Sequence, residues 1–176
     1  MRAFTQLFRN TYGNPQNSAL FNYAKGSYFA DSFSCEVPNK GQTALDVYLE
    51  IAKQTPAWIS FLMAMRNRIV SMFGLKHLGR LQDATMDIEP DHLKVGDRLG
   101  IFTLVSNTDD EIVLEDRDKH LDVRVSFLLD PQREKVTVHA TTVVHVHNRW
   151  GKAYMLFVAP VHKIIVPSSL KTFVQA

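Results

Sequence analysis

The chain has 176 residues, of which 45% are apolar and 22% are charged, and its formal net charge is +2. A chain of this length fits one domain and can bury about two thirds of the surface that its unfolded form exposes. The basic residues are scattered along the sequence, which argues against a nucleic-acid-binding protein. The only cysteine, Cys35, excludes an internal disulfide and a cysteine-rich zinc site, and it favours a cytoplasmic location.

Residues 1–26 are predicted to be an N-terminal arm, and residues 27–176 are predicted to be the folded domain. The arm contains Arg2, Arg9 and Lys25 and no acidic residue, but it lacks the continuous apolar segment of a secretory signal. Its short apolar stretches are expected to pack on the domain or on a partner. No run of about 18 apolar residues occurs in the chain, so no membrane span is predicted.

The first predicted strand covers residues 28–37, YFADSFSCEV, where aromatic and β-branched residues are frequent, and it ends at Pro38. A helix is expected next, because Thr43 is followed three residues later by Asp46 and apolar residues then recur at helical spacing. This helix is expected to end near Thr55.

A second helix is predicted from Pro56 to Gly74, because Thr55 can cap it and proline suits the first helical position. At 100° per residue its apolar arc spans about 200° and contains Trp58. Arg66 falls within this arc, where an unpaired charge would cost several kcal/mol. Its guanidinium is expected to pair with a carboxylate of the domain, to reach solvent, or to bind a carboxylate or phosphate of a small ligand.

Residues 75–96 are predicted to be a polar connection, and four antiparallel strands follow because short polar turns separate four strand-like segments. The strands are expected at 97–106, 111–118, 120–129 and 134–147. A last helix is expected from just after Asn148 to about residue 172, with interruptions at Pro160 and Pro167. This order predicts an α+β fold in which helices cover one face of an antiparallel sheet.

The last predicted strand carries three histidines in one register, His139, His145 and His147. We expect Pro131 to lie opposite Glu134 in the hairpin that contains them, because this register keeps the apolar residues of both strands on one face.

In this register His120 lies beside His145 on the polar face of the sheet. Two histidines in an H-x-H pattern and a third ligand from a neighbouring strand are compatible with zinc. No H-E-x-x-H element accompanies them, and a half-solvated strand or a subunit contact explains them better. No metal site is therefore predicted.

The last helix has an apolar arc of its own, with Tyr154 near its middle and His162 near its edge. A buried tyrosine hydroxyl needs a hydrogen-bond partner, so Tyr154 brings a polar requirement to the interior. His162 is interpreted as a histidine at the edge of the core, with acid–base chemistry as the alternative. The other members of the arc are Trp150, Phe157, Val158, Val161, Ile164 and Ile165.

Four stretches of the chain, in order, resemble an uncharacterised bacterial protein family. They are YFADSFSCEVP, PAWISFLMAMRNRIVSMFGLK, LEDRDKHLDVRVSFLL and TTVVHVHNRWGKAYMLFVAPVHKIIV, and they lie between residues 28 and 170. The family is identified as a member of the START-like, or helix-grip, superfamily. The resemblance implies a sheet that grips a long C-terminal helix, with an apolar cavity between them.

Members of that family also occur fused behind a dinucleotide-binding domain, but this chain has no G-x-G-x-x-G unit, so no cofactor is predicted. The family-like run Asp118–Arg124 falls on the polar face of the predicted sheet. If that face turned inward, His120 and Arg124 would line the cavity.

These patterns and the resemblance together predict a domain that binds a small hydrophobic or amphipathic molecule, with an anionic group as one option. The predicted ligand-binding residues are Trp58, Arg66, Phe102, Tyr154 and His162. The secondary candidates are His120, Arg124 and His145.

Two alternatives remain open. The domain could be an enzyme of the cyclase or dehydratase kind, in which His162 or His120 moves a proton and Arg66 or Tyr154 stabilises an enolate oxygen. It could also be a homo-oligomeric association domain that uses the histidine-bearing face and the arm.

Overall fold

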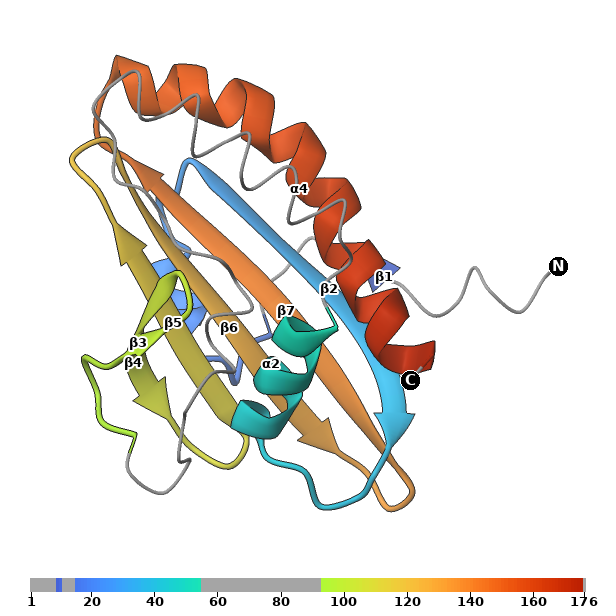
Figure 1. Ribbon diagram of the computed structural model, residues 1–176. Coiled ribbons are helices and arrows are strands. Elements are labelled where there is room, and N and C mark those ends of the chain that lie inside the picture. The colour runs from blue at the N-terminus through green and yellow to red at the C-terminus, as the bar shows by residue number, and fades with distance from the viewer. Residues whose placement is uncertain (1–8, 11–14, 55–92, 176) are drawn as a thin grey trace, which may run out of the picture.

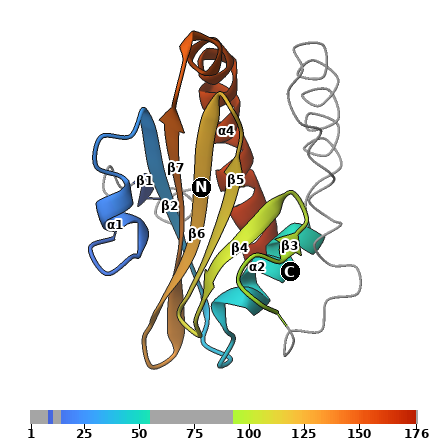
Figure 2. The same cartoon turned by 90° about the vertical axis from the view of Figure 1, so that its left-hand side faces the viewer.

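A computed structural model describes residues 9–10, 15–54 and 93–175, which form an antiparallel sheet and three helices (Figure 1). The strand order is β1-β2-β7-β6-β5-β4-β3. Helices α2 and α4 lie on one face of this sheet and α1 lies on the other (Figure 2). The strands are β1 (Arg9–Asn10), β2 (Phe29–Pro38), β3 (Arg98–Leu99), β4 (Phe102–Asn107), β5 (Glu111–Arg117), β6 (Leu121–Pro131) and β7 (Lys135–Val146). The helices are α1 (Leu20–Tyr23), α2 (Ala44–Lys53) and α4 (Arg149–Gln175). The predicted α+β class is therefore confirmed at this level.

The predicted start of α2 is confirmed in atomic detail. The backbone N–H of Asp46 donates to Thr43 Oγ1, and the backbone N–H of Thr43 donates to Asp46 Oδ2, which is a complete capping box. The predicted helix 56–74 and residues 75–92 of the predicted connection lie outside the described residues.

One predicted strand is wrong in its extent. Residues 97–106 were expected to be continuous, but they form the hairpin of β3 and β4, which turns at Gly100 with a φ of 63°. Only glycine adopts this backbone conformation without strain, which explains the break. The turn buries Leu99, whose carbonyl accepts a hydrogen bond from the Tyr48 hydroxyl at 3.0 Å.

The predicted register of the β6–β7 hairpin is wrong by two residues. Pro131 lies opposite Val136, because the backbone N–H of Gln132 donates to the carbonyl of Lys135 at 2.7 Å and the two-residue turn therefore falls one residue later than expected. A shift of two residues leaves each side chain on its predicted face.

The shifted register also changes the predicted histidine pairing. His145 lies opposite Asp122, and His120 instead pairs through its backbone with His147, whose N–H donates to the His120 carbonyl at 2.9 Å. The prediction that His120 lies beside His145 is therefore wrong.

The inner face of the sheet, which we define as the face covered by α2 and α4, carries two apolar clusters. The larger cluster joins α2 to β2, β6, β7 and Leu170 of α4. The smaller cluster contains Leu121, Val144 and Met155, with Phe29 and Tyr154 packed against it. The apolar residues of β6 and β7 were predicted to share one face, and these clusters confirm it.

The predicted interruptions of the last helix at Pro160 and Pro167 are wrong, because α4 is one continuous helix that contains both prolines. The side that faces the sheet includes Met155 and Leu170, which are 4% and 1% exposed. Four of the seven residues in its predicted apolar arc are instead exposed, namely Trp150, Phe157, Val161 and Ile164. The prediction that this arc faces the interior is therefore wrong for these four, because apolar residues occur around most of the helix and the arc alone does not select the packed side.

Candidate functional site

A polar rung crosses the otherwise apolar inner face between β2 and β7. Asp31 of β2 pairs with Thr142 of β7. The next inward pairs on either side are Phe29 with Val144 and Phe33 with Ala140. Side chains two residues apart on a strand share a face, so the carboxylate is directed to the same side as the two phenylalanines. The rung therefore lies between the smaller and the larger apolar cluster.

His162 of α4 closes this rung from the helix side. Its Nδ1 lies 3.1 Å from Asp31 Oδ2 and its Nε2 lies 3.3 Å from Thr142 Oγ1. The side chains of His162 and Asp31 are 21% and 7% exposed, and the ring of Phe29 meets the imidazole edge-on at a centroid distance of 5.8 Å. Asp31, His162 and Thr142, here called the inner triad, thus form one hydrogen-bonded chain.

The inner triad contains an acceptor atom with no matching donor. Asp31 Oδ1 is buried and has no hydrogen-bond partner among the described residues. Leaving a buried polar atom unpaired costs about 1–3 kcal/mol, and more when the group is charged. A donor supplied by a bound molecule would remove this cost, so the atom marks a place where a ligand hydroxyl or N–H group fits.

The inner face beside the triad is only partly covered on its β6 side. Val125 lies directly opposite Thr142, and both Val125 and Val123 are half-buried. A largely apolar molecule that lay over these valines could bring a donor to the neighbouring carboxylate.

Of the predicted ligand-binding residues, the structure places Tyr154 and His162 on the same helix. They are separated by eight residues, or about 12 Å along the axis. Tyr154 packs against the smaller cluster, whereas Phe102 packs against the larger one, at the start of β4. Trp58 and Arg66 lie outside the described residues.

Arg124 and His145 lie on the outer face of the sheet, which we define as the face opposite α4, where they hold the N-terminal helix α1. His145 Nε2 lies 2.9 Å from the carbonyl oxygen of Tyr23, and the two rings meet edge-on at 4.7 Å. The Arg124 guanidinium lies 4.0 Å above the Tyr23 ring, and its Nε donates to Glu115 at 2.8 Å. The burial of Tyr23 in this contact raises its pKa.

The segment that carries α1 is also fixed by a buried carboxylate. Glu111 accepts hydrogen bonds from the hydroxyls of Ser18 and Ser126 and from the backbone N–H of Ala19. Leu20 packs beside these groups and is 1% exposed. Part of the predicted arm is therefore integrated into the outer face, while the domain boundary at residue 26 stays a prediction.

His120 has a structural partner at the start of α4. Its Nδ1 lies 3.0 Å from Asn148 Oδ1, and the same oxygen accepts from the backbone N–H groups of Trp150 and Gly151 at 3.1 Å each. Asn148 thus caps the helix, and His120 supports the cap.

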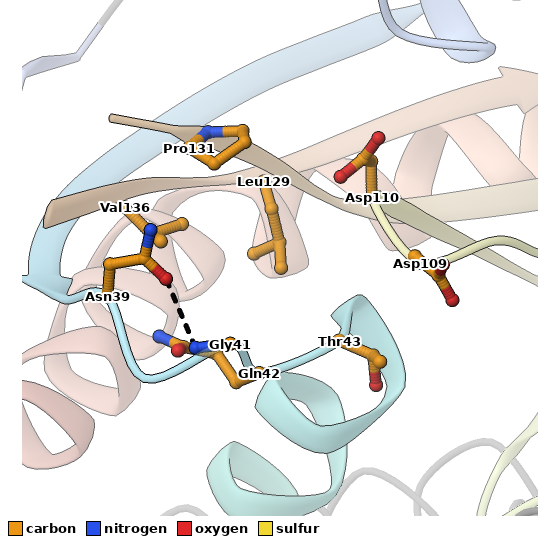
Figure 3. Close-up of a pocket in the computed structure, with 9 residues that line it drawn as sticks. All are labelled: Asn39, Gly41, Gln42, Thr43, Asp109, Asp110, Leu129, Pro131 and Val136. Atoms are coloured by element: carbon orange, nitrogen blue, oxygen red, sulfur yellow. Dashed lines mark hydrogen bonds between the residues drawn. The ribbon is translucent and has the colours of Figure 1, made fainter. Parts of the chain in front are cut away.

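A separate pocket of about 310 Å³ opens where the β2–α2 loop meets the turns at the same end of the sheet (Figure 3). None of the predicted site residues line it. Polar groups of its loop already have partners within the loop and the start of α2. The backbone N–H of Gly41 donates to Asn39 Oδ1, and that of Thr43 donates to Asp46 in the capping box. We therefore regard it as a crevice between loops. Its lining residues are Asn39, Gly41, Gln42, Thr43, Asp109, Asp110, Leu129, Pro131 and Val136.

The histidines near the end of β7 have other partners in the structure. Within 9–10, 15–54 and 93–175, no group of three or more His, Cys, Asp or Glu side chains is arranged to hold a metal ion. His147 Nε2 lies 3.2 Å from Asp122 Oδ1, and His145 Nε2 is hydrogen-bonded to the carbonyl oxygen of Tyr23 in α1.

The sequence contained a signal for the inner triad that the predicted site did not use. Asp31 has the same alternation as Phe29, Phe33 and Cys35, so it is an acidic residue on the apolar side of its own strand. Its partner on α4 is 131 residues away, which no local pattern reveals.

Comparison with known proteins supports the predicted family resemblance at a coarse level. A search of curated proteins finds no match to the chain. A family model described as a protein of unknown function, DUF2867, matches residues 23–169, which include strands β2 to β7 and most of α4. The chain therefore belongs to the DUF2867 family.

Proposed function

We propose that this chain is a helix-grip domain of the START-like superfamily that binds a small, largely apolar molecule carrying a hydrogen-bond donor. The antiparallel sheet with a long C-terminal helix on one face is compatible with that superfamily. The ligand lies between the inner face and α4, in the cytoplasm, and its donor meets Asp31. The predicted roles of Trp58 as an apolar wall and of Arg66 as a site for an anionic group of the ligand stay predictions, because both residues lie outside the described residues.

The single observation that carries this proposal is the buried acceptor Asp31 Oδ1. A carboxylate on an apolar face is costly, and the cost is only partly offset by the contact of the other oxygen with His162. A domain whose interior served only for packing would be more stable with an apolar residue there. A carboxylate retained among phenylalanines is therefore better explained by recognition of a donor than by stability.

The apolar surroundings define the rest of the ligand. The triad has Phe29 and Val144 on one side and Phe33 and Ala140 on the other, so it is a polar group between apolar neighbours on both sides. Binding sites for small molecules commonly combine such apolar walls with a few polar groups that fix orientation. An alcohol, an amine or an amide N–H on a hydrocarbon skeleton fits this pattern.

Native mass spectrometry of freshly purified protein tests the proposal. We expect a peak above the mass of the 176-residue chain, and denaturation of the same sample should release the bound molecule so that its mass can be measured. The proposal would be contradicted by two results together. The purified protein would show a single peak at the mass of the bare chain, and it would also fail to bind an added long-chain alcohol or amine.

A second candidate function is acid–base catalysis, and the connectivity of the inner triad favours it. A carboxylate at Nδ1 fixes the orientation of the imidazole, and Nε2 then faces a hydroxyl, which is the arrangement found where histidine moves a proton. A His162→Gln variant separates the two functions. In both cases the variant should still bind the molecule. In an enzyme the variant should lose the conversion of this molecule that the wild type performs, whereas in a pure binding domain neither protein should convert it.

A third candidate is association through the histidine-bearing outer face and the arm. Light scattering of the full chain and of a form that lacks residues 1–26 tests it, because truncation of an associating domain should change the number of chains in the assembly. Monomers in both samples would exclude this function.

A further inference from the structure

Helix α4 presents a row of apolar side chains on the side turned away from the sheet. Leu156, Phe157 and Ile164 are 71%, 74% and 63% exposed, and Trp150 is 65% exposed. Val161 joins them at 36%. These five residues are here called the outer stripe. Exposed large apolar residues that gather on one helix face are typical of an interaction surface.

The charges on the same helix have one sign. The sequence from Arg149 to Gln175 contains no aspartate or glutamate. Its four cations, Arg149, Lys152, Lys163 and Lys171, all occupy exposed positions. At 100° per residue, Lys152 and Lys163 lie on one flank of the outer stripe. An apolar stripe with cations along one flank and no anionic side chain on its helix is complementary to a surface that is apolar within and anionic at its edge.

We propose that the outer stripe of α4 docks the protein on the surface of an anionic lipid bilayer. Leu156, Phe157 and Ile164 enter the boundary between headgroups and acyl chains, while the flanking lysines contact anionic headgroups. Trp150, at the N-terminal end of the helix, has the amphipathic ring that is enriched at membrane interfaces.

The helix rests on the bilayer and does not cross it. Within the described residues, α4 is the only helix that is long and apolar enough to cross a membrane by length and composition. Its other face, however, packs on the sheet through Met155 and Leu170 and is hydrogen-bonded to β2 through His162. A spanning helix would have to leave these contacts, whereas a helix lying in the plane of the interface keeps them.

The charge pattern also favours lipid over a second copy of this chain. In a symmetric dimer the same face of α4 would meet itself, and its lysines would approach each other with no acidic residue on the helix to compensate. Anionic headgroups instead supply the opposite charge. This docking rests on observations separate from Asp31, so it does not depend on the proposed ligand.

Co-sedimentation of the full chain with vesicles tests the docking. Vesicles of phosphatidylcholine with about 30% phosphatidylglycerol are compared with vesicles of phosphatidylcholine alone, at low and high salt. We expect binding to the anionic vesicles that weakens as salt rises, because the lysine contribution is electrostatic.

Two double variants of α4 and two matched controls complete the test. Lys152→Glu with Lys163→Glu should weaken binding at least about 25-fold, at about fivefold per lysine. Phe157→Ser with Ile164→Ser should weaken it at least about tenfold for each residue. Val95→Ser and Lys40→Glu, at exposed positions away from α4, should leave it unchanged.

Several results would overturn the docking proposal. One is no sedimentation with anionic vesicles, and another is equal loss of binding in the two control variants. A third is wild-type dimers that Phe157→Ser with Ile164→Ser converts to monomers, since a second copy would then cover the stripe. A fourth is unfolding of that variant at much lower denaturant concentration, since the stripe would then be covered within the chain. The lysine variant, changed only at solvent-exposed positions, keeps the test valid if the apolar variant does not fold.

Discussion

His162 on α4 lies 3.1 Å from the carboxylate of Asp31 on β2, and this contact joins the two ends of the family-matched region across the inner face of the sheet. The carboxylate is 93% covered, since its side chain is 7% exposed. One carboxylate oxygen of Asp31, Oδ2, therefore contacts His162. The other, Oδ1, has no donor among the described residues.

Coupling between these two residues is the first prediction. His162→Leu removes the donor from a buried carboxylate and should lower the free energy of unfolding by about 1–3 kcal/mol or more. Asp31→Leu with His162→Leu removes the charge as well, so the double variant should be more stable than the sum of the single changes predicts, by about 1 kcal/mol or more. Urea unfolding at pH 7 of the wild type, of His162→Leu, of Asp31→Leu and of the double variant measures this coupling. Strictly additive effects on the free energy of unfolding would contradict it.

The stability of the protein should depend on pH through His139. Burial lowers the pKa of this histidine below its ordinary value of 6.5, and the charge of Asp130 partly opposes the shift. The unfolded chain therefore binds more protons than the folded one as the pH falls below about 6.5. The stability contributed by neutral His139 is present above that pH and is lost as the pH falls through the lowered pKa.

A His139→Gln variant isolates this contribution. Urea midpoints measured between pH 8 and pH 5 should fall less steeply for the variant than for the wild type, because the variant has no imidazole to charge at this position. Measurement at pH 8 serves as the control for lost packing. Parallel curves over the whole range would show that His139 has no such effect.

Cys35 should be inert in the folded protein. It is 1% exposed, and burial raises the pKa of its thiol from 9.0 to about 12, which means about a thousandfold less thiolate. Reaction with a disulfide reagent at pH 8 should therefore be at least about a thousandfold slower than that of free cysteine. Addition of denaturant should restore the normal rate, and fast labelling without denaturant would contradict the burial of this thiol.

Gly151 is required by a close approach at the start of α4. A Cβ atom there would overlap the carbonyl oxygen of His120 and would lie 2.8 Å from Val146 Cγ1. Gly151→Ala should thus destabilise the protein by about 1–3 kcal/mol, although alanine favours a helix over glycine by about 1 kcal/mol elsewhere. Ala153→Gly, at an exposed position on the same helix, is the control and should cost about 1 kcal/mol. An increase in melting temperature for Gly151→Ala would contradict the close approach.

Local patterns predicted those features that local interactions determine. The Thr43-x-x-Asp46 spacing predicted the start of α2, because a capping box is formed by residues three apart. Alternation along β6 and β7 predicted the two faces of the sheet, because side chains change sides at each residue. The register was missed by two residues, since it depends on where the turn at Gln132 closes and both registers give the same faces.

Features set by distant partners could not be predicted in the same way. The apolar residues of α4 occupy most of its circumference, so the side that packs is chosen by the sheet, and Met155 turned inward while Phe157 did not. His162 was correctly marked as a residue near the edge of the core, but Asp31 was not marked at all. Its importance arises from a contact between β2 and α4 that only the folded chain creates.

The claim that Asp31 receives a ligand's donor is tested most directly by one comparison in native mass spectrometry. The fraction of chain that retains its small molecule should fall about tenfold or more in Asp31→Asn, because a charge-assisted hydrogen bond of about 1.5–3 kcal/mol is lost. It should stay at the wild-type level in Asp109→Asn, which makes the same change at an exposed position in the loop pocket. Equal retention in Asp31→Asn and the wild type would contradict the account.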